Sequence, residues 1–269
     1  MALILVTGAT DGIGLETSHE LAQMGHEVIV HGRTAEKAQR ACKIIGQAVV
    51  QARLHSAHAD FGRLAEVADM AVDLASRHTH LDVLINNAGV YMLERKLSAD
   101  GFEMTLAVNH IAPFLLTTAL LPLLKKSADA RVVTVSSIAH TRGHIDFANL
   151  NAEQHFDAYQ TYANSKLANV LFANELARRE PGLASNSLHP GVIDTKLLHT
   201  GFSAHGAPVA EGARTSVFLA TAEQVKGISG KYFSDCAAIA PAREALDARL
   251  ARELWEWTRQ AVLHSGAPG

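Results

Sequence analysis

The stretch "TGATDGIG", residues 7 to 14, follows the apolar run "LILV" and contains Gly8, Gly12 and Gly14. The apolar run predicts a buried strand and the next residues predict a helix, so these glycines lie where a strand turns into a helix. Glycine there permits a tight turn, lets the backbone approach a pyrophosphate, and lets the helix pack closely on the strand. The free N–H groups of the helix N-terminus would bind phosphate oxygens. The alternative, an ordinary βα turn, does not need three glycines at this spacing.

Short strand-like runs alternate with longer amphipathic segments from the first residue to about residue 235. The expected strands are "LILVT", "EVIVH", "VVQARLH", "LDVLINN", "ARVVTVSS", "ASNSLHP" and "GKYFSD", and the expected helices span about 12–25, 34–47, 62–78, 98–126, 157–180 and 207–223. This alternation predicts βαβ units. We therefore expect an α/β Rossmann fold, with a doubly wound parallel sheet of about seven strands and helices on both faces.

We expect one domain over residues 1–269, because no Gly-, Ser- or Pro-rich linker interrupts the alternation. Its cofactor half would span about 1–135, and its catalytic and substrate half about 136–269. The closing stretch "PAREALDARLARELWEWTRQAVL" predicts a terminal helix packed on the core.

The composition favours a small ligand over a charged polymer. The chain is 48% hydrophobic and 19% charged, with a net charge of −3, which argues against nucleic acid or an acidic membrane held by bulk charge. Cys42 and Cys236 lie far apart and predict free thiols in a reducing cytoplasm. The histidine pairs in "HSAH" and "HTH" lack nearby acidic or cysteine partners at a zinc spacing, so we expect no metal site.

The spacing TGxxxGxG resembles the cofactor loop of the short-chain dehydrogenases/reductases. At the end of the second expected strand, "VIVHGRT" offers Arg33 and no acidic residue to the adenosine ribose. A basic residue there suits a 2′-phosphate, so we expect NADP(H), with NAD(H) possible; a solvated Arg33 is the alternative. The resemblance assigns the other cofactor contacts to residues in "TGATDGIG", "HADFG", "NNAG" and "HPGVIDT": Gly8, Thr10, Asp11, Gly12, Ile13, Gly14, Asp60, Phe61, Asn87, Ala88, Gly89, Pro190, Gly191, Ile193 and Thr195.

Tyr162 and Lys166, in "YANSK", lie one turn apart on an expected helix, so the ammonium can approach the phenol. A free phenol has a pKa of about 10, and a neighbouring cation favours the phenolate. The resemblance makes Tyr162 the general acid or base and Lys166 a ligand of the nicotinamide ribose. It also places Ser137, at the end of the fifth strand, on the reacting oxygen, with Ser136 pointing away. Asn109, in "LAVNHIAPFLLT", would hold a water beside the lysine.

The segments "NSKLANVLFANELARR", "EGARTSVFLA" and "SGKYFSD" resemble the retinol dehydrogenase-like group, which includes the WW-domain oxidoreductases. This implies NADP(H)-dependent hydride transfer between nicotinamide and a small apolar alcohol, aldehyde or ketone. A non-catalytic NADP(H)-binding redox sensor is the alternative, but it would not need the four catalytic residues. A sugar-nucleotide epimerase would need a larger C-terminal region.

The start "MALILVTG" is too short for a signal or a membrane span, so we expect no membrane anchor and a cytoplasmic location. "IAPFLLTTALLPLL" is interrupted by prolines and threonines and predicts a buried helix. By analogy the helices at 98–126 and 157–180 would form a homodimer or homotetramer. We expect an apolar substrate pocket from segments 138–158 and 196–212, with a wall from the turn after "NNAG": Ile138, His140, Ile145, Phe147, Phe156, Leu197, Leu198, Phe202, Tyr91 and Met92.

Overall fold

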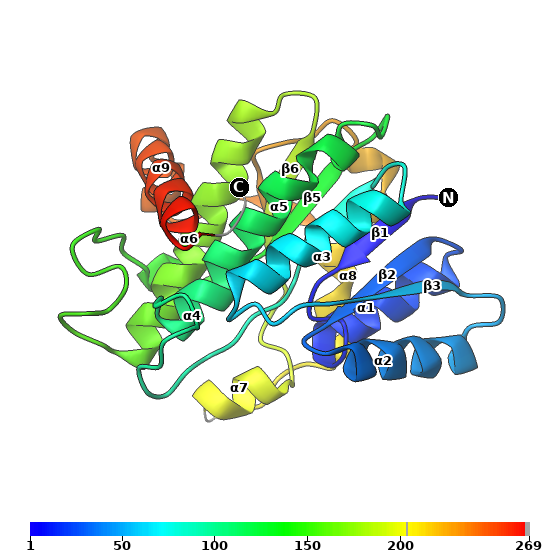
Figure 1. Ribbon diagram of the computed structural model, residues 1–269, viewed down its shortest axis with the longest axis horizontal. Coiled ribbons are helices and arrows are strands. Elements are labelled where there is room, and N and C mark those ends of the chain that lie inside the picture. The colour runs from blue at the N-terminus through cyan, green and yellow to red at the C-terminus, as the bar shows by residue number, and fades with distance from the viewer. Residues whose placement is uncertain (203, 267–269) are drawn as a thin grey trace.

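The computed structural model describes residues 1–202 and 204–266, so Ser203 of the expected substrate segment and the last three residues of the expected domain lie outside it. A single eight-stranded sheet runs through the molecule in the order β3-β2-β1-β4-β5-β6-β7-β8 (Figure 1). Its strands are β1 (Leu3–Val6), β2 (Glu27–Gly32), β3 (Arg53–His58), β4 (Val83–Asn86), β5 (Arg131–Val135), β6 (Ala184–His189), β7 (Tyr232–Ser234) and β8 (Ala237–Ile239).

The strands pair in parallel except β8, which runs antiparallel to β7. The chain leaves β1, at the centre of the sheet, in one direction to β2 and β3 and later crosses to β4. This reversal makes a topological switch point, where open α/β sheets bind ligands at the carboxyl ends of the strands. The predicted doubly wound sheet is confirmed, with one strand more than expected.

Helices cover both faces of the sheet. One face carries α1 (Gly12–Gln23), α2 (Ala35–Ala48) and α8 (Val209–Thr221), and the other carries α3 (Leu64–Arg77), α5 (Ala112–Leu124) and α6 (Ala158–Arg179). Alternate strand residues supply the two cores: Leu5 and Leu84 face α3 and α5, whereas Ile4 and Val6 face α1 and α8.

The C-terminal helix α9 (Ala248–His264) packs on the outside of α6 (Figure 1). Trp255 of α9 stacks on Phe172 of α6, with ring centroids 5.7 Å apart, and meets Phe114 of α5 edge-on. On the same helix, the Thr258 hydroxyl accepts the Nε2 proton of buried His110 at 2.9 Å. The expected docking of a terminal helix is observed, but the helix begins only at Ala248, where Asp247 accepts the amides of Arg249 and Leu250.

The expected helix at 98–126 begins later than predicted and contains a π-helical turn. Ser98 donates its amide to the Phe102 carbonyl at 2.7 Å and forms a turn, and the helix starts after Glu103, whose carboxylate accepts the Leu106 amide. It then runs as α4 (Met104–Leu106), the π-helical turn η1 (Ala107–Ile111) and α5. The expected strand "VVQARLH" is shifted, because β3 begins at Arg53. Short helices complete the chain: α7 (Lys196–Gly201) and the 3₁₀ turns η2 (Ile138–Arg142), η3 (Glu223–Val225) and η4 (Arg243–Leu246).

The continuous helical segment Met104–Leu124 has a mean hydropathy of 1.6 and meets the length and composition of a membrane span, but 78% of its apolar 18-residue window is buried inside the protein. This segment contains the apolar stretch that the sequence predicts as a buried helix.

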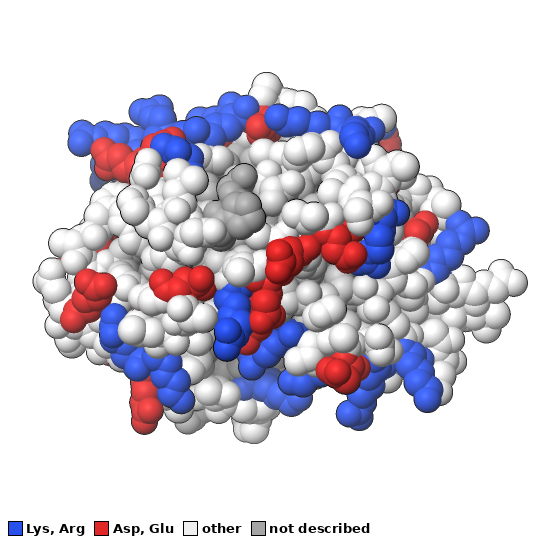
Figure 2. Space-filling view, in the orientation of Figure 1, with Lys and Arg blue, Asp and Glu red and all other residues white. Residues whose placement is uncertain are grey.

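In Figure 2, Lys and Arg side chains gather along the upper and lower edges of the face shown, with acidic side chains among them. Cys42 and Cys236 are both free thiols.

Candidate active site

The glycine-rich turn packs against the turn after β4. Gly8 and Gly12 have φ angles of +63° and +52°, in the left-handed region that favours glycine. A Cβ on Gly14 would lie 2.3 Å from the Gly8 carbonyl oxygen and 2.4 Å from Asn87 Nδ2, where no atom fits. Asn87 in turn donates Nδ2 to the Thr7 carbonyl at 2.8 Å. Two turns from different parts of the sequence therefore pack together at the carboxyl ends of β1 and β4.

Helix α1 begins at Gly12, within the glycine-rich turn. The Asp11 side chain accepts the Gly12 amide at 2.9 Å and also forms an ion pair with Lys196 at the start of α7. The hydrogen bond from Lys196 holds the pKa of Asp11 below its usual value. The first turn of a helix carries N–H groups without intrahelical partners, so this end of α1 can bind an anion.

A cavity of about 510 Å³, here called the glycine-loop cavity, lies along these carboxyl ends. It brings together the predicted cofactor residues Gly8, Thr10, Asp11, Gly12, Ile13, Gly14, Arg33, Asp60, Phe61, Asn87, Ala88, Gly89 and Thr195. Its wall also contains His31 and Lys37, which the sequence analysis missed. Lys37 could have been found, because it lies in the first turn of α2, four residues after Arg33, whereas His31, the last residue but one of β2, carries no such signal.

The rim of this cavity at the end of β2 is basic. Arg33 Nε lies 4.0 Å from Asp60 Oδ1, and their side chains are 60% and 37% exposed. An ion pair this long and this exposed contributes little, so the guanidinium is available for another anion. Lys37 borders the same cavity from α2. Together Arg33 and Lys37 can bind a doubly charged group such as a phosphate.

A second cavity of about 290 Å³, here called the Tyr162 cavity, adjoins the first, since Ile13, Asn87, Gly89, Thr195 and Leu197 border both. Of the predicted residues it contains Ser137, Tyr162, Lys166, Pro190, Gly191 and Ile193. The structure thus places the predicted catalytic serine, tyrosine and lysine at one end of a continuous space that starts at the glycine-rich turn.

Tyr162 is buried, and this burial raises its pKa to about 12, while the Ser137 hydroxyl in hydrogen-bonding contact acts in the opposite direction. Lys166 Nζ lies 5.6 Å from the centre of the tyrosine ring and donates to the Val135 carbonyl at 3.2 Å. Burial lowers the pKa of this ammonium to about 8. Both groups are therefore held toward their uncharged forms, and a polar ligand that accepted from Lys166 would restore its charge.

Ser136 and Ser137 point in different directions, as predicted for neighbours at the end of a strand. The Ser136 hydroxyl donates to the Lys166 carbonyl at 2.7 Å, whereas the Ser137 hydroxyl accepts the Ala139 amide at 3.2 Å and faces Tyr162. Ser136 thereby fixes α6 to β5. This leaves Ser137 as the serine whose hydroxyl faces the phenol.

Asn109 lies on the π-helical turn, a local geometry frequent at functional sites. Its Oδ1 accepts the Val90 amide at 2.8 Å, and its Nδ2 donates to the Val90 carbonyl and to the Ser165 hydroxyl, both at 3.0 Å. The side chain thus joins the turn after β4 to α6 close to Lys166. Its role in holding a water stays a prediction.

Thr195 and Gly191 shape the segment after β6. The Thr195 hydroxyl caps α7 by accepting the Leu198 amide at 3.3 Å, and its methyl group lies beside Gly12. Gly191 has a φ angle of +98°, which a side chain would strain. This segment also carries Ile193, and together these residues form part of the wall of the Tyr162 cavity.

The expected apolar pocket is only partly correct. Ile138, Leu197, Leu198 and Phe202 border the Tyr162 cavity, together with Tyr159, His189, Val192 and Ala204, which the sequence analysis missed. Tyr91 and Met92 border the glycine-loop cavity, and the Tyr91 ring lies 5.3 Å from those of Tyr162 and Phe202.

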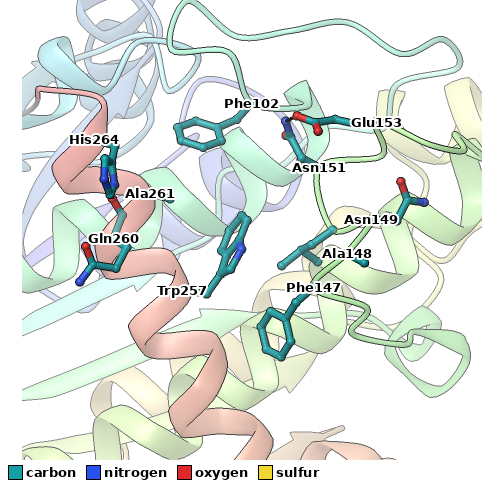
Figure 3. Close-up of a pocket in the computed structure, with 11 residues that line it drawn as sticks. Phe102, Phe147, Ala148, Asn149, Asn151, Glu153, Trp257, Gln260, Ala261 and His264 are labelled. Carbon is teal, nitrogen blue, oxygen red and sulfur yellow. Dashed lines mark hydrogen bonds between the residues drawn. The ribbon is translucent and has the colours of Figure 1, made fainter.

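Four expected pocket residues border neither the Tyr162 cavity nor the glycine-loop cavity. His140 is buried because its Nδ1 donates to the Ser137 carbonyl at 2.7 Å and its Nε2 accepts the Ala242 amide. Ile145 belongs to the core, and Phe156 does not reach the cavity. Phe147 instead borders, with Trp257 and Phe102, a separate cavity of about 390 Å³ beside α9 (Figure 3).

Within residues 1–202 and 204–266 no three His, Cys, Asp or Glu side chains come together in a way that could hold a metal ion.

Comparison with known proteins identifies the family. Residues 2–205 match the short chain dehydrogenase family. Human retinol dehydrogenase 13 is 40% identical, over 96% of this chain and 84% of its own length, and mouse retinol dehydrogenase 14 is 39% identical, over 94% and 83%.

Solved structures agree with this assignment. An uncharacterized protein from Mycobacterium paratuberculosis superposes with a TM-score of 0.82 and 31% identity, over 98% of this chain and 94% of that one. A short chain dehydrogenase from Shigella flexneri complexed with NADP has a TM-score of 0.72 and 25% identity, over 88% and 97%. The chain therefore belongs to the short chain dehydrogenase family, in its retinol dehydrogenase-like group, and is an oxidoreductase that acts on CH–OH groups.

Proposed function

We propose that this protein is an NADP(H)-dependent oxidoreductase that interconverts a small apolar alcohol and the corresponding aldehyde or ketone. The observation that carries the proposal is the convergence of Ser137, Tyr162 and Lys166 on one cavity that continues into the glycine-loop cavity. When bound, the nicotinamide supplies or accepts the hydride.

The residues of the glycine-loop cavity fit such a cofactor. A Cβ on Gly14 would collide with the Gly8 carbonyl oxygen and with Asn87, so glycine lets α1 pack closely on the turn, and the N-terminus of α1 borders the cavity with its free amides. At the other end, Arg33 and Lys37 border the cavity and can hold a 2′-phosphate, which favours NADP(H) over NAD(H). Between these ends, Asn87, Ala88 and Gly89 form one wall.

Tyr162 is the residue of this chain that moves a proton. In carbonyl reduction its hydroxyl donates to the forming alkoxide, and in alcohol oxidation the phenolate removes the hydroxyl proton. The Ser137 hydroxyl orients the same substrate oxygen. Lys166 favours the phenolate when its ammonium is charged, and the apolar side chains of Ile138, Leu198 and Phe202 exclude water around the reacting carbon.

Tyr162→Phe tests the proposal. The variant keeps the ring that contacts Tyr91 and Phe202 and removes only the proton-transfer group. We expect unchanged NADPH binding and almost complete loss of turnover in a screen of apolar ketones, aldehydes and alcohols followed by cofactor fluorescence. Turnover retained in this variant would contradict the assignment of Tyr162.

The assembly and location of the protein belong to the same proposal. We propose a cytoplasmic homodimer or homotetramer, which the free thiols and the family analogy support. Helix α9 covers part of α6, so contacts through α5 and α6 would use the sides that α9 leaves open. Light scattering after size-exclusion chromatography tests this, and a monomer at micromolar concentration would contradict it.

A further inference from the structure

His31 connects the two loops that border the glycine-loop cavity. At the carboxyl end of β2, its ring Nδ1 accepts the Gly8 amide at 3.1 Å, and its Nε2 lies 3.2 Å from the Ala59 carbonyl oxygen. Because a carbonyl oxygen can only accept, Nε2 carries the proton and Nδ1 is the acceptor. The two contacts therefore require one neutral tautomer of the ring.

The main chain beside His31 makes a parallel pair of contacts. The His31 carbonyl accepts the Ala9 amide at 2.8 Å, and the Gly32 carbonyl accepts the Ala59 amide at 3.2 Å. Any residue at position 31 could keep these two bonds, since they need no side chain. The ring adds a second bond to each loop, and those bonds depend on histidine.

The surroundings of the ring keep it in the required form. The side chain is 3% exposed and stacks on Phe61, with ring centroids 4.6 Å apart and planes 28° apart. Burial lowers the pKa of His31 to about 4, so the ring is neutral at pH 7. A protonated ring would present N–H groups to both loops and could not accept from Gly8.

The groups that His31 binds are themselves part of the cofactor site. Gly8, Ala59 and Phe61 border the glycine-loop cavity, as His31 does. His31 also occupies the amides of Gly8 and Ala9, so an incoming phosphate must be bound further along, at the start of α1. A histidine that only filled the core would have no reason to bind the two cavity loops at once.

We propose that His31 is a positioning residue for the cofactor, whose neutral ring holds the glycine-rich loop and the loop after β3 in their binding geometry. It sets the affinity for NADP(H) and NAD(H) alike and does not contact the reacting atoms. The inference rests on the proposed function, because it assumes that a nicotinamide cofactor fills this cavity.

Fluorescence titration of the 269-residue chain with NADPH and with NADH tests the proposal. His31→Leu loses both ring contacts and leaves the Gly8 amide without a partner, so we expect affinity to fall about tenfold for both cofactors. His31→Asn keeps an acceptor near Nδ1 and should recover part of the loss. His31→Gln keeps a donor near Nε2 without that acceptor and should recover less.

His26→Leu is the matched control. The His26 Nδ1 accepts the Ala2 amide at 3.2 Å at the opposite end of the same two strands. Its loss removes a similar bond far from the cavity, and we expect unchanged affinity for both cofactors. Thermal melting of each variant without cofactor shows whether it is folded.

The outcomes separate this inference from the proposed function. If wild-type protein binds neither NADPH nor NADH, both fail. If wild type binds and His31→Leu binds equally well, His31 is not a positioning residue, while the proposed function stands. If His31→Leu does not fold, the other two variants decide. His31→Asn must then bind NADPH and NADH more tightly than His31→Gln does, and equal affinities of these two variants would overturn the inference.

Discussion

Replacing Lys166 with methionine should make the cofactor-free protein more stable while abolishing its activity. Burial lowers the pKa of the ammonium from 10.5 to about 8. Since one pKa unit corresponds to about 1.4 kcal/mol, keeping this side chain protonated costs the folded state about 3 kcal/mol. Methionine has a similar length and no charge, and the Val135 carbonyl that Lys166 now binds keeps its contact with Asn169.

The pH dependence of this gain follows from linkage. Below about pH 8 both the folded and the unfolded protein hold the lysine proton, so the full cost applies and Lys166→Met should gain about 3 kcal/mol in unfolding free energy. Between pH 8 and 10.5 the unfolded state binds more protons than the folded state, so wild-type stability rises with pH through this group. The advantage of the variant should shrink over this window and vanish above it.

Urea denaturation at pH 7 and at pH 10, with both proteins free of cofactor, measures the difference. Lys125→Met is a suitable control, because Lys125 is 55% exposed and pairs with Glu180 at the surface. A Lys166→Met protein that is equally stable or less stable at pH 7 would refute the reasoning, since the buried ammonium would then carry no net cost. A gain in unfolding free energy that stays constant from pH 7 to pH 10 would refute it as well.

Three further predictions concern separate parts of the molecule. Arg33→Asp should weaken NADPH binding about tenfold or more and leave NADH binding less affected, because the 2′-phosphate loses a charged partner; an unchanged ratio of the two dissociation constants would show that another group binds the phosphate. Ser137→Ala should lower kcat about a hundredfold with little change in NADPH affinity, because the reacting oxygen loses a hydrogen bond, as the Ala139 amide does, while the cofactor loses none; a wild-type kcat would exclude this role. Trp255→Ala should cost about 3 kcal/mol of unfolding free energy, because the ring packs on Phe114 and Phe172; the half-buried Trp257→Ala is the control, and equal losses would contradict the packing argument.

Much of the fold follows from the sequence because parallel strands are buried on both faces. Runs such as "LILV" and "RVVTV" are apolar or uncharged along most of their length and therefore predict buried strands without further information. Strand β8 was missed for the converse reason, since its three residues are all exposed and their pairing depends on β7. The π-helical turn was also missed, because its sequence is compatible with a continuous helix.

Spacing places Tyr162 and Lys166 on one face of a helix, and it places the glycine-rich turn and Ser137 at the same carboxyl edge of the sheet. The roles of these residues and the other cofactor contacts could be named only from the family resemblance. The substrate pocket could not be predicted in detail, because it depends on where long loops turn. His140 and Phe147 lie in the expected segment, yet His140 binds the Ser137 carbonyl and Phe147 borders the cavity beside α9. His31 was missed because a histidine within a strand has no recognisable spacing.

The bond between His110 and Thr258 has a consequence for biosynthesis. The two residues are 148 positions apart, and His110 is the neighbour of Asn109 on the π-helical turn. A growing chain can build the sheet and the glycine-rich turn on the ribosome. The π-helical turn, however, receives the hydrogen bond between His110 and Thr258 only after the C-terminal helix α9 has been synthesised. Until then Phe114 and Phe172 lack their cover, so a stalled chain would present an apolar surface to chaperones instead of a finished enzyme.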